Sequence, residues 1–299
     1  MASRVRVYTA AGKYLTELDG KITRSWLLNA VGVAKITLPI TDIKATEENL
    51  RYGNFVYIEN DRADEWGGMI WTPRQWTPAT VEVTAYSAAY LLRQRRVQAG
   101  LISGTAGEMM NALINMANIQ ESTGITVGQV NSQSAIWSEE LKFQSIYDML
   151  NKIAAASNED YSVDPVFDSA GLMSFVVNWY IHKGNDYNFR FEEGLNIERP
   201  GGATLTEQGD IANDVLVYGN SGSQTSSLYS NQLDTPSIAQ YGLRQVSIGS
   251  SATSQTTLDA LAAGQLAVLK NPTNSHKAIL IDHNNAFDYA REGDSVLLR

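Results

Sequence analysis

The chain has 299 residues, of which 43% are hydrophobic, and a formal net charge of −9 at pH 7. This length suggests about two domains, with ample apolar material for more than one buried core. The absence of cysteine excludes disulfides and thiolate sites, and the acidic balance argues against tight binding to DNA or to anionic membranes.

The apolar runs of the sequence give no sign of membrane insertion. Residues 1–15 lack the apolar stretch of a secretory signal, and no run approaches the roughly 18 apolar residues of a spanning helix. The richest run, at 172–181, is short and reads as a strand. We therefore expect a protein that is soluble when made.

Residues 1–98 are predicted to be all-β. Their alternating apolar residues, punctuated by turns, predict a series of short strands. These strands are expected at residues 4–8, 14–18, 33–40, 54–59, 68–71 and 80–85. Many short strands at roughly even spacing favour a small barrel or sandwich.

Residues 99–200 change character and predict an α+β insert. Thr105 and Glu108 fit a capping box, in which each side chain satisfies a free N–H group at the start of a helix. A second helix is expected from Ser145 to about residue 158. Its predicted buried stripe is Ile146, Met149, Leu150, Ile153 and Ala154. A hairpin turning at 169–171 follows the second helix.

Residues 201–299 return to a β-rich pattern with one helix. Strands are expected at 214–220, 278–282 and 295–299, and a helix at 257–270. The polar stretch 221–232 reads SGSQTSSLYSNQ and cannot bury much surface, so we expect an exposed, mobile loop there. The fold class is therefore α+β and mainly β.

The stretch 52–76 contains a double glycine, Gly67-Gly68, among three tryptophans at positions 66, 71 and 76. It has no lysine or hydroxyl residue in P-loop register and lies between strands, so phosphate binding is not indicated. A β-bulge or a close backbone approach is the default interpretation. In a regular strand Trp66 and Trp71, five positions apart, would face opposite sides, whereas a bulge would change that parity and place both on one face. The tryptophans fit a core or an interface, and stacking on a sugar is the alternative.

No catalytic signature emerges from the titratable residues. The three histidines, His182, His276 and His283, match no known metal-ligand spacing, although the last two flank one predicted strand. The acidic pairs at 139–140 and 192–193 are adjacent, and neighbouring residues on a strand point to opposite faces. A glycosidase needs two carboxylates that face one sugar, so hydrolysis stays a minor alternative. We expect no catalytic residue, no cofactor and no metal.

The run RQRR at 93–96 is the one concentration of positive charge in this acidic chain. A nucleic-acid contact is one interpretation. Since arginine is the preferred cation at interface ion pairs, we expect instead that Arg93, Arg95 and Arg96 pair with acidic groups of a neighbouring subunit.

A series of short motifs runs in order along the whole chain. These motifs are VRVYTAAGKYLTELDGKI (5–22), SWLLNAVGVAKITLPI (25–40), YGNFVYIEN (52–60), DEWGGMI (64–70), TVEVTAYSAAYLLRQRRV (80–97), FEEGLNIE (191–198), DIANDVLVYGN (210–220), YGLRQ (241–245), the helix at 257–270 and EGDSV (292–296). In this order they resemble the tail-hub, or baseplate-hub, proteins of long-tailed bacteriophages.

The resemblance implies a homotrimer in the virion, at the distal end of the phage tail. Residues 1–98 and 201–299 would form two β-barrel-like tube domains, with residues 99–200 inserted between them. Three copies would form a pseudo-sixfold ring that continues the tail tube. The implied partners are the distal tail protein, the tape measure protein, and tail fibre or tip proteins. The sequence ends just after EGDSV, so we expect no appended lytic domain.

The acidic balance fits such a tube. Carboxylates that face a lumen would repel phosphates, so viral DNA would pass without tight binding. Two other function classes remain open at this point. The tryptophans leave a carbohydrate- or receptor-binding module, and the acidic pairs leave a cell-wall hydrolase.

Overall fold

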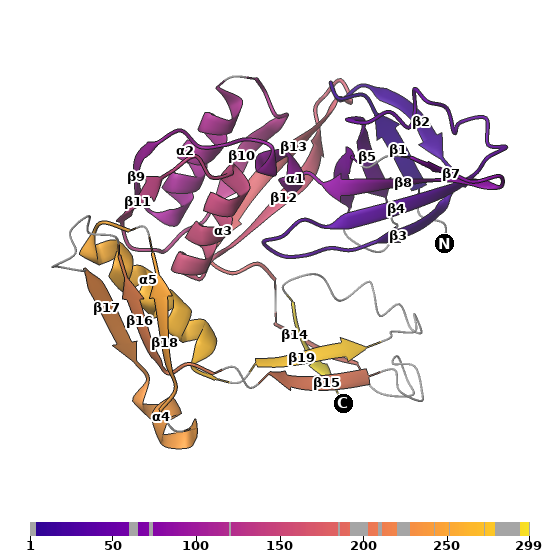
Figure 1. Ribbon diagram of the computed structural model, residues 1–299. Helices are drawn as coiled ribbons and strands as arrows, with labels where there is room; N and C mark the ends of the chain where they lie inside the picture. Colours follow the sequence, from indigo (N-terminus) through magenta and orange to yellow (C-terminus); the bar gives the residue numbers. More distant parts are fainter. Residues whose placement is uncertain are drawn as a thin grey trace.

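The computed structural model describes residues 4–59, 65–71, 74–119, 121–184, 186–191, 203–208, 211–219, 228–241, 243–250, 252–271, 273–278 and 294–298 (Figure 1). The fold is mainly β, and most of its strand pairs are antiparallel. Within the described ranges, no helix combines the length and hydrophobicity needed to cross a bilayer.

The first eight strands form one antiparallel sheet, called here the first sheet, in the order β2-β1-β5-β6-β8-β4-β3, with β7 paired to β8. Among the described residues this pairing does not close, and β2 and β3 lie at its edges. The strands predicted in this region are confirmed to within about two residues at each end. Their bounds are β1 Arg4–Tyr8, β2 Tyr14–Leu18, β3 Lys21–Arg24, β4 Val33–Pro39, β5 Phe55–Glu59, β6 Trp66–Ile70, β7 Gln75–Trp76 and β8 Thr80–Ser87.

One face of the first sheet encloses a core of its own, called here the inner core. Alternate residues of each strand point into it, as the period of two requires. Its members are Val5, Val7, Leu18, Ala34, Ile36, Leu38, Ala45, Leu50, Val56, Ile58, Trp66, Ile70, Val81, Val83 and Ala85.

The middle of the chain packs three helices against a small sheet of order β10-β13-β12 and a two-stranded pair of β9 and β11. The predicted capping box at Thr105 and Glu108 is confirmed, as is the buried stripe of the helix after Ser145. That helix ends at Asn158, whose φ of 55° gives it a left-handed cap. The bounds are α1 Ala89–Arg93, β9 Gly100–Gly104, α2 Ala106–Asn118, β10 Ile125–Val130, β11 Trp137–Leu141, α3 Ile146–Ser157, β12 Asp160–Phe167 and β13 Met173–Tyr180.

A second hydrophobic core, called here the shared core, joins the first sheet to this middle part. Tyr8, Phe55, Tyr57 and Met69 of the first sheet are buried in it together with side chains from α2, α3, β12 and β13. Strands β5 and β6 are consequently buried on both faces, with alternate residues in the inner core and in the shared core. Figure 1 shows the two parts side by side.

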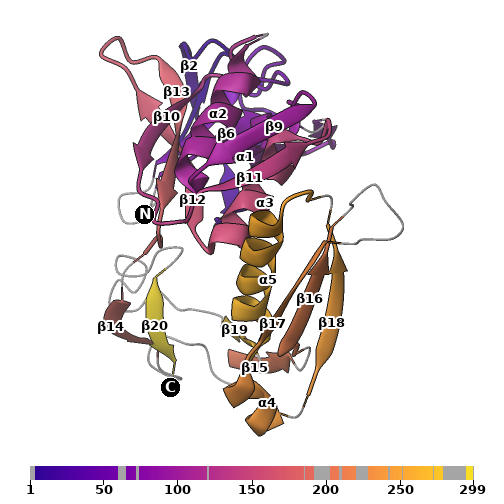
Figure 2. The ribbon, with the colours of Figure 1, turned by 90° about the vertical axis from the view of Figure 1, so that its left-hand side faces the viewer.

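The last third contains a three-stranded sheet of order β17-β16-β18, covered by α5 (Figure 2). Two further pairs lie nearby: β14 runs parallel to β20, and β15 runs antiparallel to β19. The bounds are β14 Asp186–Phe191, β15 Ala203–Gln208, β16 Asp214–Tyr218, β17 Tyr229–Leu233, α4 Thr235–Tyr241, β18 Gln245–Gly249, α5 Gln255–Leu269, β19 Thr273–Ala278 and β20 Ser295–Leu298.

One prediction in this region is wrong in part, and another falls largely outside the described residues. Residues 229–232 were expected in a loop but belong to β17, where pairing with β16 satisfies their backbone and their polar side chains point largely outward. The rest of the loop prediction falls on residues that lie outside the described ranges, except Leu228. The strand expected at 278–282 is described only to residue 278, where β19 ends.

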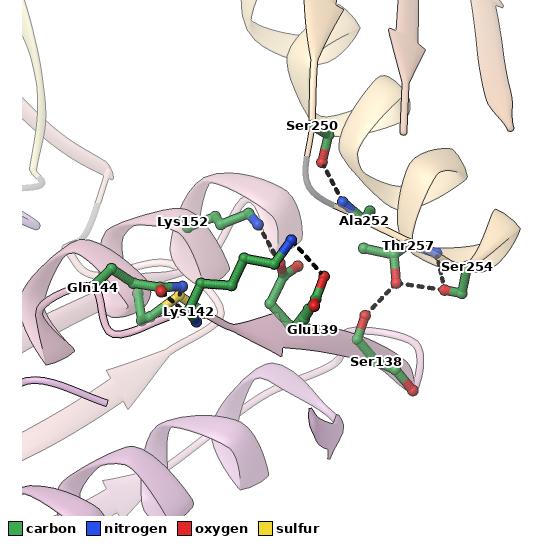
Figure 3. A network of polar contacts seen from close by, with 11 residues as sticks. Ser138, Glu139, Lys142, Gln144, Lys152, Ser250, Ala252, Ser254 and Thr257 are labelled. Carbon is green, nitrogen blue, oxygen red and sulfur yellow. Dashed lines mark hydrogen bonds and ion pairs between the residues drawn. The ribbon is translucent and has the colours of Figure 1, made fainter. Parts of the chain in front are cut away.

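Helix α5 packs closely against α3 through Gly264 (Figure 2). A Cβ atom at Gly264 would lie 2.9 Å from the carbonyl oxygen of Ala155, closer than real contacts allow. Near the start of α5, the Thr257 hydroxyl donates a hydrogen bond to the carbonyl oxygen of Ser138 (Figure 3). The last third is therefore attached to the middle part through backbone as well as side-chain contacts.

A buried ion pair lies beside that junction (Figure 3). Glu139 is 1% exposed and pairs with Lys152, whose side chain is about a quarter exposed. Burial raises the pKa of Glu139 above its ordinary value, and the ammonium of Lys152 offsets part of that rise.

Replacing Lys152 with alanine should destabilise the protein in a pH-dependent manner. The variant leaves a buried carboxylate without its cation, at a cost of about 1–3 kcal/mol in the free energy of unfolding. Since the pKa of Glu139 rises further, the carboxyl becomes protonated as the pH falls and the cost shrinks. Urea unfolding should therefore show a larger loss at pH 7.5 than at pH 5.5.

The matched control is Lys35→Ala, which breaks the exposed pair of Lys35 with Glu82. Its effect should stay below about 1 kcal/mol at both pH values. A Lys152→Ala loss that is equal at the two pH values would contradict the assignment.

Candidate interaction surfaces

The double glycine lies in the middle of β6, between the two cores. A Cβ atom at Gly67 would lie 2.7 Å from Cβ of Pro165 and 3.0 Å from Cε1 of Phe175, both in the hairpin of β12 and β13. A Cβ atom at Gly68 would lie 2.2 Å from the carbonyl oxygen of Tyr86. Both glycines therefore serve close approach, and Gly67 is one of the positions where the middle part contacts the first sheet.

Of the two interpretations of these glycines, the close backbone approach is confirmed and the β-bulge is not present. The pairing of β5 with β6 is regular from Phe55 opposite Met69 to Ile58 opposite Trp66. With the period of two intact, Trp66 and Trp71 lie on opposite sides of the sheet, as five positions along a regular strand require, and the shared face that a bulge would give is absent. The backbone stays regular because the neighbouring residues occupy the space that side chains at 67 and 68 would fill. No extra residue, as in a bulge, is needed to make room for them.

The three tryptophans have different surroundings. Trp66 is 2% exposed and donates its indole N–H to the carbonyl oxygen of Ser25 at 3.3 Å. Trp71 is half-buried between Tyr52 and Tyr90, with ring centroids 4.5 and 4.9 Å away. Trp76 on β7 is exposed. They form no common platform for a sugar, because Trp66 is in the inner core.

The arginine run follows α1 and lines a groove of about 460 Å³, called here the Phe143 groove. Arg93 is the last residue of α1 and lies over the ring of Tyr147, and Arg95 pairs with Glu121 of its own chain at 3.7 Å. Arg96 forms a backbone bridge with Ser145. The lining residues are 93–98, Met116, Ala117, Ile119, Phe143 and Ser145.

Arg93 and Arg96 are exposed, and within the described part of the chain neither has a carboxylate within ion-pair distance. Two guanidinium groups are thus free to pair with another molecule. The pairing of Arg93, Arg95 and Arg96 with a neighbouring subunit stays a prediction, with Arg95 already engaged in part by Glu121.

A second hollow, of about 400 Å³, lies where the loop between β3 and β4 meets β12. Asn29, at φ 54°, connects the two parts there. Its amide donates to Oδ1 of Asp160 at 2.8 Å, and its side-chain oxygen accepts from the backbone N–H of Tyr161 at 2.7 Å. This hollow marks the junction between the first sheet and the middle part.

In the described part of the chain, the acidic residues singled out from the sequence do not converge on one site. Among the described residues, no group of three or more His, Asp or Glu side chains is placed to hold a metal ion. Glu139 points into the interior and its neighbour Glu140 points away, as the alternation predicts. Glu159 is also buried, but it accepts hydrogen bonds from Trp179, Ser132 and two backbone N–H groups. The pair at 192–193 and His283 lie outside the described residues.

The fold is similar to that of several solved tail proteins. Prophage tail protein gp18 from Listeria monocytogenes superposes with a TM-score of 0.63 and 13% identity, over 99% of this chain and 84% of that one. The tail protein from Neisseria meningitidis gives 0.60 and 14%, over 100% and 87%. The 43 kDa tail protein of prophage MuSo2 from Shewanella oneidensis gives 0.56 and 12%, over 88% and 77%.

No model of a protein family matches the sequence, and a search of curated proteins finds no match. The likeness to the solved structures therefore rests on the fold. At that level the resemblance to phage tail proteins is confirmed.

Sequence reasoning identified the arginine run but missed the apolar residues that share its groove. Ile119 follows α2 and Phe143 lies between β11 and α3, so neither is close to the arginines in sequence. A large apolar residue within a polar turn, as in KFQS at 142–145, is the one signal that was available.

Replacing Gly67 with alanine should destabilise the protein by about 1–3 kcal/mol, because the added methyl group overpacks against Pro165 and Phe175. Thermal or urea unfolding measures the loss. The matched control is Gly100→Ala, since a Cβ atom there meets nothing within 4 Å. That change should stay within about 0.5 kcal/mol. Equal effects of the two substitutions would contradict the close approach at Gly67.

Proposed function

We propose that this protein is a structural hub of a bacteriophage tail tip. The supporting observation is the fold, which matches solved tail proteins, two of them from prophages, over 88% or more of the chain. In the proposed assembly, three copies form a pseudo-sixfold ring that continues the tail tube at its distal end. The role is structural rather than enzymatic.

The proposed ring uses two barrel-like tube domains from each subunit. We assign residues 1–98 to the first and 201–299 to the second, with the insert 99–200 outside or below the ring. The first sheet, wrapped around the inner core, is consistent with the first assignment. A small separate core under α5, containing Val215, Val217, Leu258 and Ala262, is consistent with the second.

The position in the tail defines the proposed partners. The ring would contact the distal tail protein above, the tape measure protein inside, and fibre or tip proteins below. Attachment to the host and ejection of the genome would then act through this hub. The net charge of −9 suits a tube through which DNA passes without being held.

The purified protein should form trimers. Light scattering after size exclusion should give three times the 32.8 kDa mass of the chain, either alone or after addition of the neighbouring tail proteins. Because association follows mass action, the fraction of chains in the trimer should increase with protein concentration. A monomer under all of these conditions would contradict the proposal.

Electron microscopy of the same sample tests the arrangement. A ring with a central lumen is expected, and a predominantly basic lumen would contradict the proposed role of the acidic charge.

Reversing the charge of the two unpaired arginines should weaken this assembly. In Arg93→Glu/Arg96→Glu, like charges would face one another across the subunit contact. We therefore expect the dissociation constant of the trimer to rise about tenfold or more. Lys13→Glu, at an exposed turn far along the sequence, is the matched control. Sedimentation at several concentrations measures the change. Unchanged trimer yield would refute the role of these arginines.

A further inference from the structure

Phe143 has a backbone conformation that its side chain disfavours. Its φ is 59°, and the other non-glycine residues with positive φ in the described part of the chain are Asn29 and Asn158. Asparagine tolerates this region, whereas a bulky aromatic residue is a rare exception. The ring is nevertheless 65% exposed. Such strain persists where the surrounding structure enforces it, often at binding surfaces.

The turn that carries Phe143 is fixed by Gln144. Oε1 of Gln144 accepts from the backbone N–H of Lys142 at 2.6 Å, and its amide nitrogen donates to the sulfur of Met149 at 2.6 Å. Its backbone carbonyl accepts from Val97 at 2.9 Å. The turn therefore presents the aromatic ring to solvent in one orientation.

The surroundings of Phe143 combine apolar and basic groups. Ile119, across the groove, is 70% exposed. Arg93 and Arg96 line the same groove, whereas Glu121 beside Arg95 is an acidic group on its rim. The groove thus suits an exposed aliphatic side chain accompanied by carboxylates.

A segment of that kind exists elsewhere on this chain, in the connection between β4 and β5, called here the Ile43 loop (residues 40–49). Ile43 is 89% exposed. The loop is anchored to the first sheet, because Ala45 and the following Leu50 are buried in the inner core. The side-chain amide of Asn54 also donates to the carbonyl oxygens of Glu48 and Asn49.

In the ion pairs around the Ile43 loop, the acidic side chain is more exposed than the basic one. Asp19 pairs with Lys44, and their side chains are 81% and 37% exposed. Glu47 pairs with Arg74, and theirs are 84% and 26% exposed. Glu48 is exposed as well. An approaching arginine would therefore meet carboxylates first.

The two surfaces lie at opposite ends of β8. Ile40 donates its backbone N–H to the carbonyl oxygen of Ala79, immediately before β8 begins, whereas α1 and the arginines follow its other end. Figure 1 shows α1 and the turn between β7 and β8 at the two ends of the first sheet. The two surfaces therefore lie apart within one copy, and a second copy can supply the partner surface.

We propose that the Ile43 loop of one subunit docks in the Phe143 groove of the next. The contact joins two different surfaces, so it is heterologous, and three such contacts close a ring. This inference rests on the proposed trimer and identifies the surfaces that build it. Ile43 packs against Phe143 and Ile119, and Arg93 and Arg96 pair with Glu47, Glu48 and Asp19.

Disulfide trapping tests the contact, and the cysteine-free sequence makes it specific. The double variant Ile43→Cys/Phe143→Cys, oxidised at a concentration that favours assembly, should give covalent dimers and trimers on a non-reducing gel. Each single variant should give no more than background. The control Val268→Cys/Phe143→Cys, which uses another exposed apolar side chain, should behave like the single variants.

Each alternative result has a defined meaning. Efficient dimers from Phe143→Cys alone would indicate a symmetric contact and overturn the inference. Species longer than trimers from the double variant would overturn closure at three. A trimer in light scattering without cross-linking would overturn the inference but leave the proposed function standing. A monomer without cross-linking under all conditions would overturn both.

A second variant separates strain from docking. Phe143→Gly relieves the backbone at φ 59°, so the melting temperature of the monomer should stay equal or rise. The trimer should dissociate at least about tenfold more readily, since a central aromatic side chain is lost from the contact. Unchanged trimer dissociation would overturn the role of Phe143, whatever the melting temperature.

Discussion

The burial of β5 and β6 on both faces is the constraint on which the rest of the structure depends. An antiparallel sheet commonly keeps one face in water, but here the second face is the floor of the shared core. The hairpin of β12 and β13 packs against that face, and at Gly67 the missing side chain lets Pro165 and Phe175 approach the backbone of β6. The orientation of the middle part on the first sheet follows from this contact together with the Asn29 hydrogen bonds, the backbone hydrogen bond from Met173 to Gly12 and the ring contacts of Phe167 with Tyr8 and Tyr57.

The same solution recurs at the other junction. Gly264 lets α5 approach the backbone of α3, and the Thr257 hydroxyl donates to the backbone of β11 nearby. In both places the contact is between backbone atoms or rigid rings, which repack less readily than long side chains. Parts of the chain that are distant in sequence are thereby held in defined orientations.

The sequence was sufficient to predict the helices whose ends and buried faces depend on residues close together in the chain. The capping box at Thr105 and the helix after Ser145 depend on residues three or four positions apart, and a sequence displays such spacing directly. Pairing between distant strands is not displayed in this way. Strand β17 reads as polar loop because its backbone partners are on β16, and the parallel pair of β14 and β20 joins residues about a hundred positions apart.

The candidate surfaces show the same limit. The arginine run could be predicted from composition, but its groove is completed by Ile119 and Phe143 from other elements. The sequence left a bulge and a close backbone approach open at Gly67-Gly68, because glycine in a strand has both uses, and only the position of the β12–β13 hairpin decides between them.

The two cores also bear on the proposed assembly. The Ile43 loop is supported by the inner core, whereas the Phe143 groove belongs to the middle part and is supported by the shared core. A heterologous contact closes into a ring only at one rotation between neighbouring subunits, and a small error in that angle gives an open chain instead. In the proposed ring, this rotation is set within each subunit by the junction between the first sheet and the middle part, of which Gly67 is one contact. A packing defect there would therefore change assembly as well as stability, although Gly67 itself contacts no neighbouring subunit in this arrangement.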